Sequence, residues 1–298
     1  MPVAGGLVDR VEPDGRPLTG GATVTEPVAV TAVTFDFGNT LVPIRDDELS
    51  AVVDRTARDV AEQCGPFAPG AFQAAWHDER DRQFAEEVPA MREVDLEQRM
   101  CRVLALLRGL SPPRARERWD DDAAAVLSTA DERAAAIDAY SRAFVELVPA
   151  PPDVGPMLER LAGRFRLGIL SNWPLATIID RYAEAAGWDR HLDAIVVSQR
   201  VGTIKPDPAI FAAAAAALQT SGAEILHVGD DWLADVVGAK RAGWRAAYLR
   251  NAQAGSPLPS SSPEADRTAV PDLVLDRLAE LEDRLVELEG RLGHVPLA

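Results

Sequence analysis

Val33-Thr34-Phe35-Asp36-Phe37-Gly38-Asn39-Thr40-Leu41 is the stretch on which the fold prediction is built. An apolar, β-branched run that stops at an aspartate, before a glycine and small polar residues, is typical of a buried parallel strand that ends at a reactive turn. In open α/β sheets ligands bind beyond the carboxyl ends of the strands, a position that suits Asp36 as a nucleophile or metal ligand. Taken alone, the same residue also fits a helix N-cap or an Asx-turn.

Short apolar runs separated by alanine-rich helical segments follow in the second half of the chain. Strands that alternate with helices in this way predict a parallel sheet. The predicted fold class is therefore α/β, with a doubly wound, Rossmann-like parallel sheet. The predicted strands lie at residues 167–171, 194–198, 224–230, 245–249 and 273–275.

A helical span separates the first strand from this alternation. Apolar residues recur at helical spacing through residues 44–150, which predicts an α-helical bundle of roughly four segments inserted into the sheet domain. The sheet domain itself would comprise residues 28–43 and 151–298. Residues 1–27 are rich in Gly, Pro and Thr without periodicity and predict a disordered tail. The breaks between the predicted helices fall at residues 64–70, 111–113 and 149–152.

Composition limits the class of protein. The formal charge is −16, which argues against nucleic acid or an anionic membrane as a partner. No signal-peptide pattern and no long apolar span is present, and Cys64 and Cys101 fit buried free thiols, so we expect a cytoplasmic protein. Leucines at heptad spacing over residues 278–292 favour a terminal helix on its own sheet over a dimer contact, which leaves monomer or homodimer open.

Polar residues follow several of the predicted strands. Ser171, Lys205, Asp230 and Asp235 all lie where a strand gives way to a loop or helix. Each also has an ordinary structural explanation, as a cap or a solvated side chain. Lys205 is the most informative, because the chain has only two lysines among its 31 basic residues. In a chain that otherwise uses arginine, a lysine at such a position indicates that the site needs a compact point charge.

Together these motifs resemble the haloacid dehalogenase superfamily. The resemblance covers residues 30–43 and 150–276, and the helical insert matches the position of that family's helical cap domain. It implies an Asp36 nucleophile that forms an aspartyl-phosphate. Thr40 would help to hold the nucleophile loop, Ser171 and the Asn172 backbone would bind the phosphoryl oxygens, and Lys205 would neutralise Asp36 and the transferring group.

The resemblance also implies a Mg²⁺ site. The ligands would be the second oxygen of Asp36, the Gly38 carbonyl and Asp230, while Asp235 would orient a metal-bound water or Lys205. Mg²⁺ prefers oxygen ligands and is usually held by one or two carboxylates. A carboxylate approaches a phosphate only where cations offset the charge, so Mg²⁺ and Lys205 would act together.

The chain departs from the family's phosphatases at Gly38. These enzymes usually carry a second aspartate there, which protonates the leaving alcohol and later activates water. General acid–base help is worth about 10²–10⁴ in rate. Three outcomes stay open: a substrate with a good leaving group, an acid supplied by the cap or by Asp46 or Asp47, or a lost activity.

The expected function is that of a Mg²⁺-dependent phosphatase acting on a small phosphorylated metabolite. The alternative is a catalytically weak or inactive member of the fold used for binding or assembly. A 2-haloacid dehalogenase is less favoured, because the acidic pair Asp230 and Asp235 is retained and Phe211 stands where that branch has tyrosine. Phosphonate cleavage through a cap lysine is excluded, since residues 44–150 contain none.

Substrate contacts in the helical insert are harder to predict. Trp173 and Trp232 are adjacent to strand-end motifs and are expected near the site, either in contact with substrate or packed beneath the cap. The insert offers further candidates that a helix surface explains equally well. These are Trp76, His77, Arg80 and Arg82.

Overall fold

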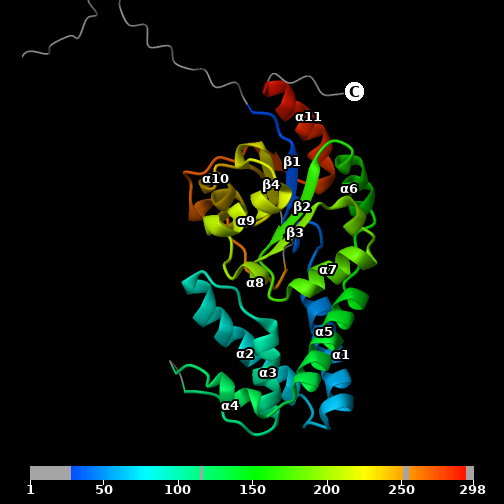
Figure 1. Ribbon diagram of the computed structural model, residues 1–298, viewed down its shortest axis with the longest axis vertical. Helices are drawn as coiled ribbons and strands as arrows, with labels where there is room; N and C mark the ends of the chain where they lie inside the picture. The colour runs from blue at the N-terminus through cyan, green and yellow to red at the C-terminus, as the bar shows by residue number, and fades with distance from the viewer. Residues whose placement is uncertain (1–27, 115–116, 251–254, 293–298) are drawn as a thin grey trace, which may run out of the picture.

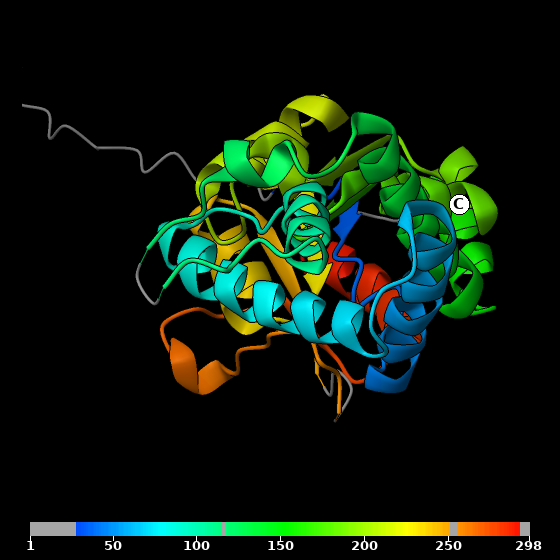
Figure 2. The same cartoon turned by 90° about the horizontal axis from the view of Figure 1, so that it is seen from below.

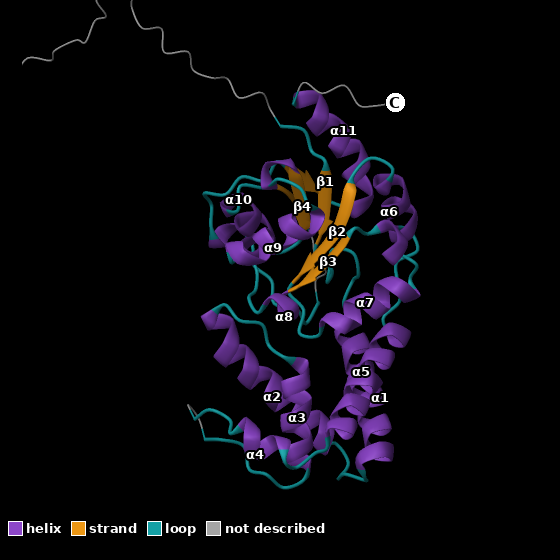
Figure 3. Ribbon diagram, in the orientation of Figure 1, coloured by secondary structure: helices purple, strands orange, loops and turns teal. Residues whose placement is uncertain are grey.

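A computed structural model of the protein describes residues 28–114, 117–250 and 255–292. The tail predicted for residues 1–27 lies outside the described residues. Within the described part, an upper half that contains the sheet joins a lower half made only of helices and loops (Figure 3).

The sheet is parallel throughout and six-stranded, in the order β3-β2-β1-β4-β5-β6, which confirms the predicted fold class. From β1 the chain proceeds outward through β2 and β3, then returns beside β1 as β4 and proceeds the other way. The order therefore reverses between β1 and β4, where doubly wound sheets bind their ligands. The strands are β1 (Ala32–Phe35), β2 (Arg166–Ser171), β3 (Ala194–Val197), β4 (Ile225–Gly229), β5 (Arg245–Leu249) and β6 (Leu273–Leu275).

Helices cover both faces of the sheet (Figure 1). The side chains of β1 point alternately to the two faces of the sheet. Val33 and Phe35 belong to the larger hydrophobic core, and Ala32 belongs to the core beneath α9. β1 is buried along its whole length, which explains why apolar residues lie on both of its faces. On one side lie α6 (Val154–Ala162), α7 (Ala176–Ala185) and α11 (Leu281–Arg291), on the other α9 (Pro208–Leu218) and α10 (Gly238–Arg241), with α8 (Ser198–Val201) following β3.

The lower half consists of α1 to α5, of which α1 packs on α5 and α2 on α3. Seen from that end, α1 and α2, in blue and cyan, lie nearer to the viewer than the strands (Figure 2). The described part of this span holds five helices, against roughly four predicted. Two interruptions fall outside the predicted breaks. One lies between α2 and α3, where a short 3-10 turn over Val88–Ala90 contains Pro89 and Met91 has φ 57°. The other lies between α4 and α5, where Thr129 caps the start of α5. The helices are α1 (Asp46–Cys64), α2 (Ala71–Glu87), α3 (Leu96–Leu107), α4 (Asp121–Ala125) and α5 (Ala130–Leu147).

The terminal helix packs inside the subunit, as its leucine spacing favoured. Leu281, Leu285 and Leu288 of α11 are buried in the larger core. Arg160 of α6 forms an ion pair with Glu282 at 2.6 Å, on the outer side of this contact. The seam of α11 thus covers the sheet domain itself.

The expectations for the two cysteines and for membrane spans can be compared with the structure. Cys64 and Cys101 are free, as predicted, but both are half-buried rather than buried. Across the described ranges, none of the helices combines the length and the apolar character needed to cross a bilayer.

Candidate active site

The loop that carries Asp36 begins where β1 ends. The Asp36 amide donates to the Val228 carbonyl of β4 at 2.8 Å, so the last sheet bond of β1 is made at the aspartate itself. The chain then turns sharply: the amides of Leu41 and Val42 donate to the Phe37 carbonyl, and Asn39 adopts φ 58°. Asparagine is one of the few residues that tolerate this conformation. The turn leaves the Asp36 carboxylate at the strand ends, with 14% of its side chain exposed.

Lys205 lies at the centre of the site. Its Nζ donates to Asp36 Oδ1 at 2.8 Å, to Asp235 Oδ1 at 2.6 Å and to the Leu170 carbonyl at 2.9 Å. An ammonium has three donors, so all of them are used. Burial would lower the pKa of Lys205, but Asp235 and Asp36 outweigh it and raise the pKa, which keeps the side chain charged.

The Asn172 side chain positions the backbone of Lys205. The Lys205 amide donates to Asn172 Oδ1 at 2.7 Å, and Asn172 Nδ2 donates to the Lys205 carbonyl at 3.1 Å. This side chain therefore ties the loop after β2 to the loop that carries the ammonium. The sequence prediction assigned Asn172 a role through its backbone, and the side-chain contact was not foreseen.

Asp235 is held from three directions. Besides Lys205, it accepts from the Asp231 amide at 2.9 Å and contacts His227 Nε2 at 3.1 Å. Burial would raise the pKa of Asp235, but Lys205 and His227 hold it below its usual range. Its place depends on Gly229, where a Cβ atom would lie 2.2 Å from the Asp235 carboxylate.

His227 is a site residue that the sequence analysis missed. It lies within β4, fully buried, and its Nδ1 is 2.9 Å from Thr34 Oγ1 of β1. Burial lowers the pKa of His227, so the ring is neutral near pH 7. Because the Asp235 carboxylate only accepts, Nε2 carries the proton and Nδ1 accepts from Thr34. A histidine inside an otherwise apolar strand, two residues before Gly229-Asp230, was the available signal.

Asp36, Asp230 and Asp235 form an acidic cluster, with one oxygen from each lying within 4.8 Å of the others. Thr40 Oγ1 donates to Asp230 Oδ1 at 3.0 Å, which links the loop that carries Asp36 to the loop after β4. Burial and the nearby Asp36 and Asp235 raise the pKa of Asp230 to about 8, and burial also raises that of Asp36. Facing carboxylates with raised pKa values fit a divalent cation with oxygen ligands.

Ser171 ends β2 beside Asp36. Its Oγ is buried and forms no hydrogen bond with any residue that the structure describes, although it lies close enough to the Asp36 carboxylate to lower the pKa of that group. A buried hydroxyl without a partner is rare. It offers a donor to a substrate oxygen that approaches Asp36.

Gly38 is closely surrounded by apolar side chains. A Cβ atom there would lie 2.6 Å from Leu258 Cδ1 and 3.1 Å from the Trp173 ring. Trp173 packs edge-on against Phe37, with ring centroids 5.3 Å apart. The space that an acid at position 38 would occupy is therefore filled by apolar side chains.

The other acids and aromatics named from sequence lie as follows. Asp46 and Asp47 are exposed at the start of α1. Trp232 is buried and donates its Nε1 to the Asp266 carbonyl at 2.7 Å, so it packs beneath that loop. In the helical half, Trp76 is buried, Arg80 pairs with Asp81, Arg82 pairs with Glu79, and His77 is exposed.

Residues 91–96, between α2 and α3, contact the strand ends. The Met91 carbonyl accepts from Thr203 Oγ1 at 3.0 Å and from the Ile204 amide at 3.3 Å. Glu93 accepts from Ser198 Oγ, and burial raises the pKa of Glu93. The Leu96 amide donates to the Pro174 carbonyl at 3.0 Å. These contacts, which sequence reasoning did not find, bring the helical half against the loops that carry Ser171 and Lys205.

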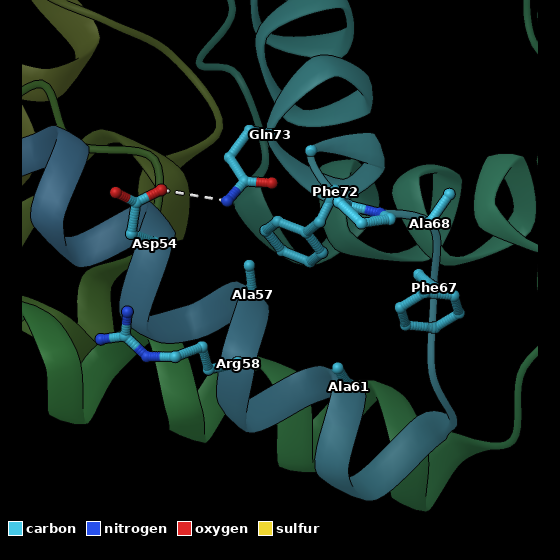
Figure 4. Close-up of a pocket in the computed structure, with 10 residues that line it drawn as sticks. Asp54, Ala57, Arg58, Ala61, Phe67, Ala68, Phe72 and Gln73 are labelled. Carbon is cyan, nitrogen blue, oxygen red and sulfur yellow. Dashed lines mark hydrogen bonds between the residues drawn. The ribbon is translucent and has the colours of Figure 1, made fainter.

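A separate pocket of about 400 Å³ lies between α1 and the start of α2 (Figure 4). Ala57, Arg58 and Ala61 of α1 form one side of it, and Phe72 belongs to the other. Gln73 Nε2 donates to Asp54 Oδ1 across it at 3.0 Å. None of the residues of the acidic cluster lines this pocket.

Comparison with curated proteins gives relatives that are phosphatases by name. The chain is 31% identical over 151 residues to glyceraldehyde 3-phosphate phosphatase of Methanopyrus kandleri. The aligned segment covers 50% of this chain and 62% of that protein. It is 30% identical over 151 residues to ribulose-1,5-bisphosphate 5-phosphatase of Halopiger xanaduensis, covering 49% and 61%. The matched segment thus spans about three fifths of these relatives.

Solved structures share the fold. A 2-haloacid dehalogenase from Pseudomonas syringae superposes with a TM-score of 0.58 at 24% identity, covering 87% of this chain and 99% of that one. A phosphatase from Thermococcus onnurineus gives a TM-score of 0.51 at 20% identity, covering 86% and 98%. A family model described as haloacid dehalogenase-like hydrolase matches residues 30–243.

Proposed function

Because this chain belongs to the haloacid dehalogenase-like hydrolases, we propose that it is a Mg²⁺-dependent phosphatase acting on a small phosphorylated metabolite, with Asp36 as nucleophile. The observation that carries the proposal is the buried Lys205 ammonium between Asp36 and Asp235. A carboxylate nucleophile must meet an anionic phosphate, which requires positive charge at that point. The phosphatase relatives support the same reaction class.

In the proposed reaction, an Asp36 oxygen attacks phosphorus and the bond from phosphorus to the leaving oxygen breaks. The product of this step is an acyl phosphate on Asp36, which water then hydrolyses to phosphate and the free carboxylate. The unpartnered Ser171 Oγ would donate to a phosphoryl oxygen. Lys205 would offset the charge of Asp36 and of the transferring group, while Asp235 and Asn172 hold Lys205 in place.

The acidic cluster would hold Mg²⁺ through oxygen ligands from Asp36, Asp230 and the Gly38 carbonyl. When bound, the ion supplies positive charge that offsets the carboxylates and polarises the phosphate. Thr40 fixes the Asp230 carboxylate toward the nucleophile loop. Asp235 would act chiefly on Lys205, since its oxygens already accept from Lys205, His227 and the Asp231 amide.

The packing at Gly38 bears on the leaving group. Leu258 and Trp173 fill the space beside Gly38, so no acid from this loop reaches the departing oxygen. We therefore expect phosphates with good leaving groups, such as aryl and acyl phosphates, to react about 10²–10⁴ faster than alkyl phosphates. Of the three outcomes that Gly38 leaves open, this favours the first, a substrate with a good leaving group.

Residues 44–150 would act as a cap over the strand ends. The Leu96–Pro174 and Met91–Ile204 backbone contacts place this half against the loops of the site. A cap in that position would exclude water and select the substrate. The domain boundaries, the cytoplasmic location and the choice between monomer and homodimer stay predictions from sequence.

The alternatives are weaker on specific grounds. A binding protein without activity would have no need to keep Asp36, Ser171, Lys205 and Asp230 together. Displacement of halide needs no metal, whereas the acidic cluster is complete. Phe211 is buried against Trp244, in the core under α9, and gives the dehalogenase branch no support.

The test is phosphate release from p-nitrophenyl phosphate, acetyl phosphate and a set of alkyl phosphates, each with Mg²⁺ and with EDTA. Release that needs both Mg²⁺ and Asp36, shown with Asp36→Asn, supports the proposal. Asp47→Asn exchanges an exposed aspartate and serves as the matched control. Unchanged release by Asp36→Asn would overturn the nucleophile assignment, and halide release from 2-haloacids without phosphate release would favour the dehalogenase.

A further inference from the structure

Arg99 of α3 is a buried cation without an anionic partner. Only 4% of the residue is exposed. Its Nε donates to Gln83 Oε1 at 2.9 Å, and its guanidinium lies over the Trp76 ring, with Cζ 5.2 Å from the ring centroid. The buried Nη2 has no hydrogen-bond partner among the residues that the structure describes. Buried polar groups are normally satisfied, and charged ones are normally paired.

The acids closest to Arg99 are engaged elsewhere. Glu79 accepts from Trp119 Nε1 at 2.8 Å and pairs with Arg82 and Arg102. Glu93 accepts from Ser198 Oγ. Within the described ranges neither acid comes within ion-pair distance of Arg99, and burial lowers the pKa of Arg99 to about 10. The guanidinium therefore has a buried donor, Nη2, that is not used by any residue the structure describes.

The position of Arg99 on α3 directs it toward the strand ends. The helix begins at Leu96, whose amide donates to the Pro174 carbonyl in the loop after Ser171. Helical side chains lean toward the N-terminus of their helix. Arg99, one turn after Leu96, therefore leans toward the start of α3, where its partner Gln83 donates through Nε2 to the Asp95 carbonyl. Ser171 Oγ is another buried polar atom without a partner in the described part.

Tyr140 of α5 completes this group. Its ring stacks on Trp76 with centroids 4.9 Å apart, and only 8% of the residue is exposed. Burial raises the pKa of Tyr140 to about 12, so the hydroxyl stays protonated and can donate. Arg99 and Tyr140 thus both lie against Trp76, and each carries a hydrogen-bond donor.

We propose that Arg99, with Tyr140, binds a second anionic group of the substrate while its phosphate lies at Asp36 and Ser171. The substrate is then a phosphate ester that also carries a carboxylate or a second phosphate. The inference rests on the proposed phosphatase function. A planar guanidinium binds either group through parallel hydrogen bonds, and such charge-assisted bonds are stronger than neutral ones.

The kinetic test compares 2-phosphoglycolate with ethyl phosphate, which lacks the carboxylate, and uses p-nitrophenyl phosphate to report the chemistry at Asp36 alone. Wild type is expected to prefer 2-phosphoglycolate, and Arg99→Met to lose about 10- to 100-fold in kcat/KM for that ester only. Arg99→Lys keeps the charge and should retain part of the preference. An equal loss on all three esters, or no preference in wild type, would overturn the inference.

Arg102→Met is the matched control. Arg102 lies on the same helix, is equally buried and stacks over Trp119, but it is paired with Asp121 at 2.8 Å. It should lower the melting temperature without changing the ratio between the two alkyl esters. A change of that ratio as large as in Arg99→Met would contradict the assignment to Arg99.

Binding separates this inference from the proposed function. In the Asp36→Asn background, calorimetric titration of 2-phosphoglycolate and ethyl phosphate reports recognition without turnover. Arg99→Met should weaken binding of 2-phosphoglycolate about 10-fold or more and leave ethyl phosphate unchanged. If wild type fails on p-nitrophenyl phosphate, the proposed function fails, while a 2-phosphoglycolate affinity that depends on Arg99 still supports the anion site. Affinity independent of Arg99 would overturn it.

Discussion

A Cβ atom at Gly229 would lie 2.2 Å from the carboxylate carbon of Asp235. The end of β4 thus approaches this carboxylate so closely that only glycine fits. Asp235 cannot move aside freely, because Lys205, His227 and the Asp231 amide all bind it.

We therefore expect Gly229→Ala to displace Asp235 from Lys205 and to lower phosphate release at least 100-fold, together with the melting temperature. Gly290→Ala is the control, because a Cβ at Gly290 in α11 meets no atom within 4 Å. That variant should keep full activity and gain a little stability from helix propensity. Normal turnover by Gly229→Ala would show that Asp235 is not needed where it lies.

The two lysines of the chain offer a matched pair of variants. Lys205→Met leaves Asp36 and Asp235 buried without their cation, and breaking a buried pair in this way costs about 3–5 kcal/mol of unfolding free energy. Activity should also be lost. Lys240 pairs with Asp272 at 2.8 Å with a third of its side chain exposed, so Lys240→Met should cost under about 1 kcal/mol. Urea unfolding and phosphate release measure both effects, and equal costs would contradict the argument.

Metal binding should appear as thermal stabilisation. Mg²⁺ at 100 times its dissociation constant would stabilise the wild type by about 2.7 kcal/mol. Asp230→Asn removes one proposed ligand, so Mg²⁺ should no longer raise its melting temperature. Asp47→Asn, which exchanges an exposed aspartate of α1, should respond as the wild type does. A full Mg²⁺ response in Asp230→Asn would remove Asp230 from the ligand set.

Glu93 should make stability depend on pH. Burial raises its pKa above 4.5, although Ser198, Arg99 and Lys205 each oppose the shift. A raised pKa in the folded state means that its stabilising contribution is complete below pH 4.5 and is lost as pH rises through the folded-state pKa. Glu93→Gln, which resembles the protonated acid, should therefore gain stability over wild type as pH rises from 4.5 to 8. Denaturant unfolding across that range checks the trend.

Glu97→Gln provides the comparison for Glu93, since it exchanges an exposed carboxylate in the first turn of α3, four residues further along the chain. Its unfolding free energy should follow that of the wild type at every pH. A Glu93→Gln profile parallel to wild type would show that Glu93 titrates alike in the folded and unfolded states.

The strands and the polar residues at their ends could be predicted because both signals are local. An apolar run that stops at Asp36, or at Gly229-Asp230, marks a strand end directly in the sequence, and parallel strands bring such ends to one edge. The retention of Lys205 in an arginine-rich chain also needs no knowledge of the fold. The six-stranded parallel sheet confirms the predicted fold class, and the family match confirms the resemblance.

The remaining site features depend on contacts between distant segments. Leu258 approaches Gly38 across 220 positions of sequence, and His227 reads as one more strand residue until Thr34 and Asp235 are known to lie beside it. Arg99 shares its amphipathic helix with Arg102, which is equally buried, and only the absence of an acidic partner among the described residues distinguishes Arg99. Periodicity reports which face of a helix is apolar, and it carries no information about which partner a polar side chain will meet.

The two hydrogen bonds that the Met91 carbonyl accepts have a mechanical consequence. Their donors, Thr203 Oγ1 and the Ile204 amide, belong to the residues immediately before Lys205. A displacement of the segment between α2 and α3 must either break both bonds or carry the backbone next to the ammonium with it. The position of the Lys205 ammonium relative to Asp36 and the position of the helical half relative to the sheet therefore change together.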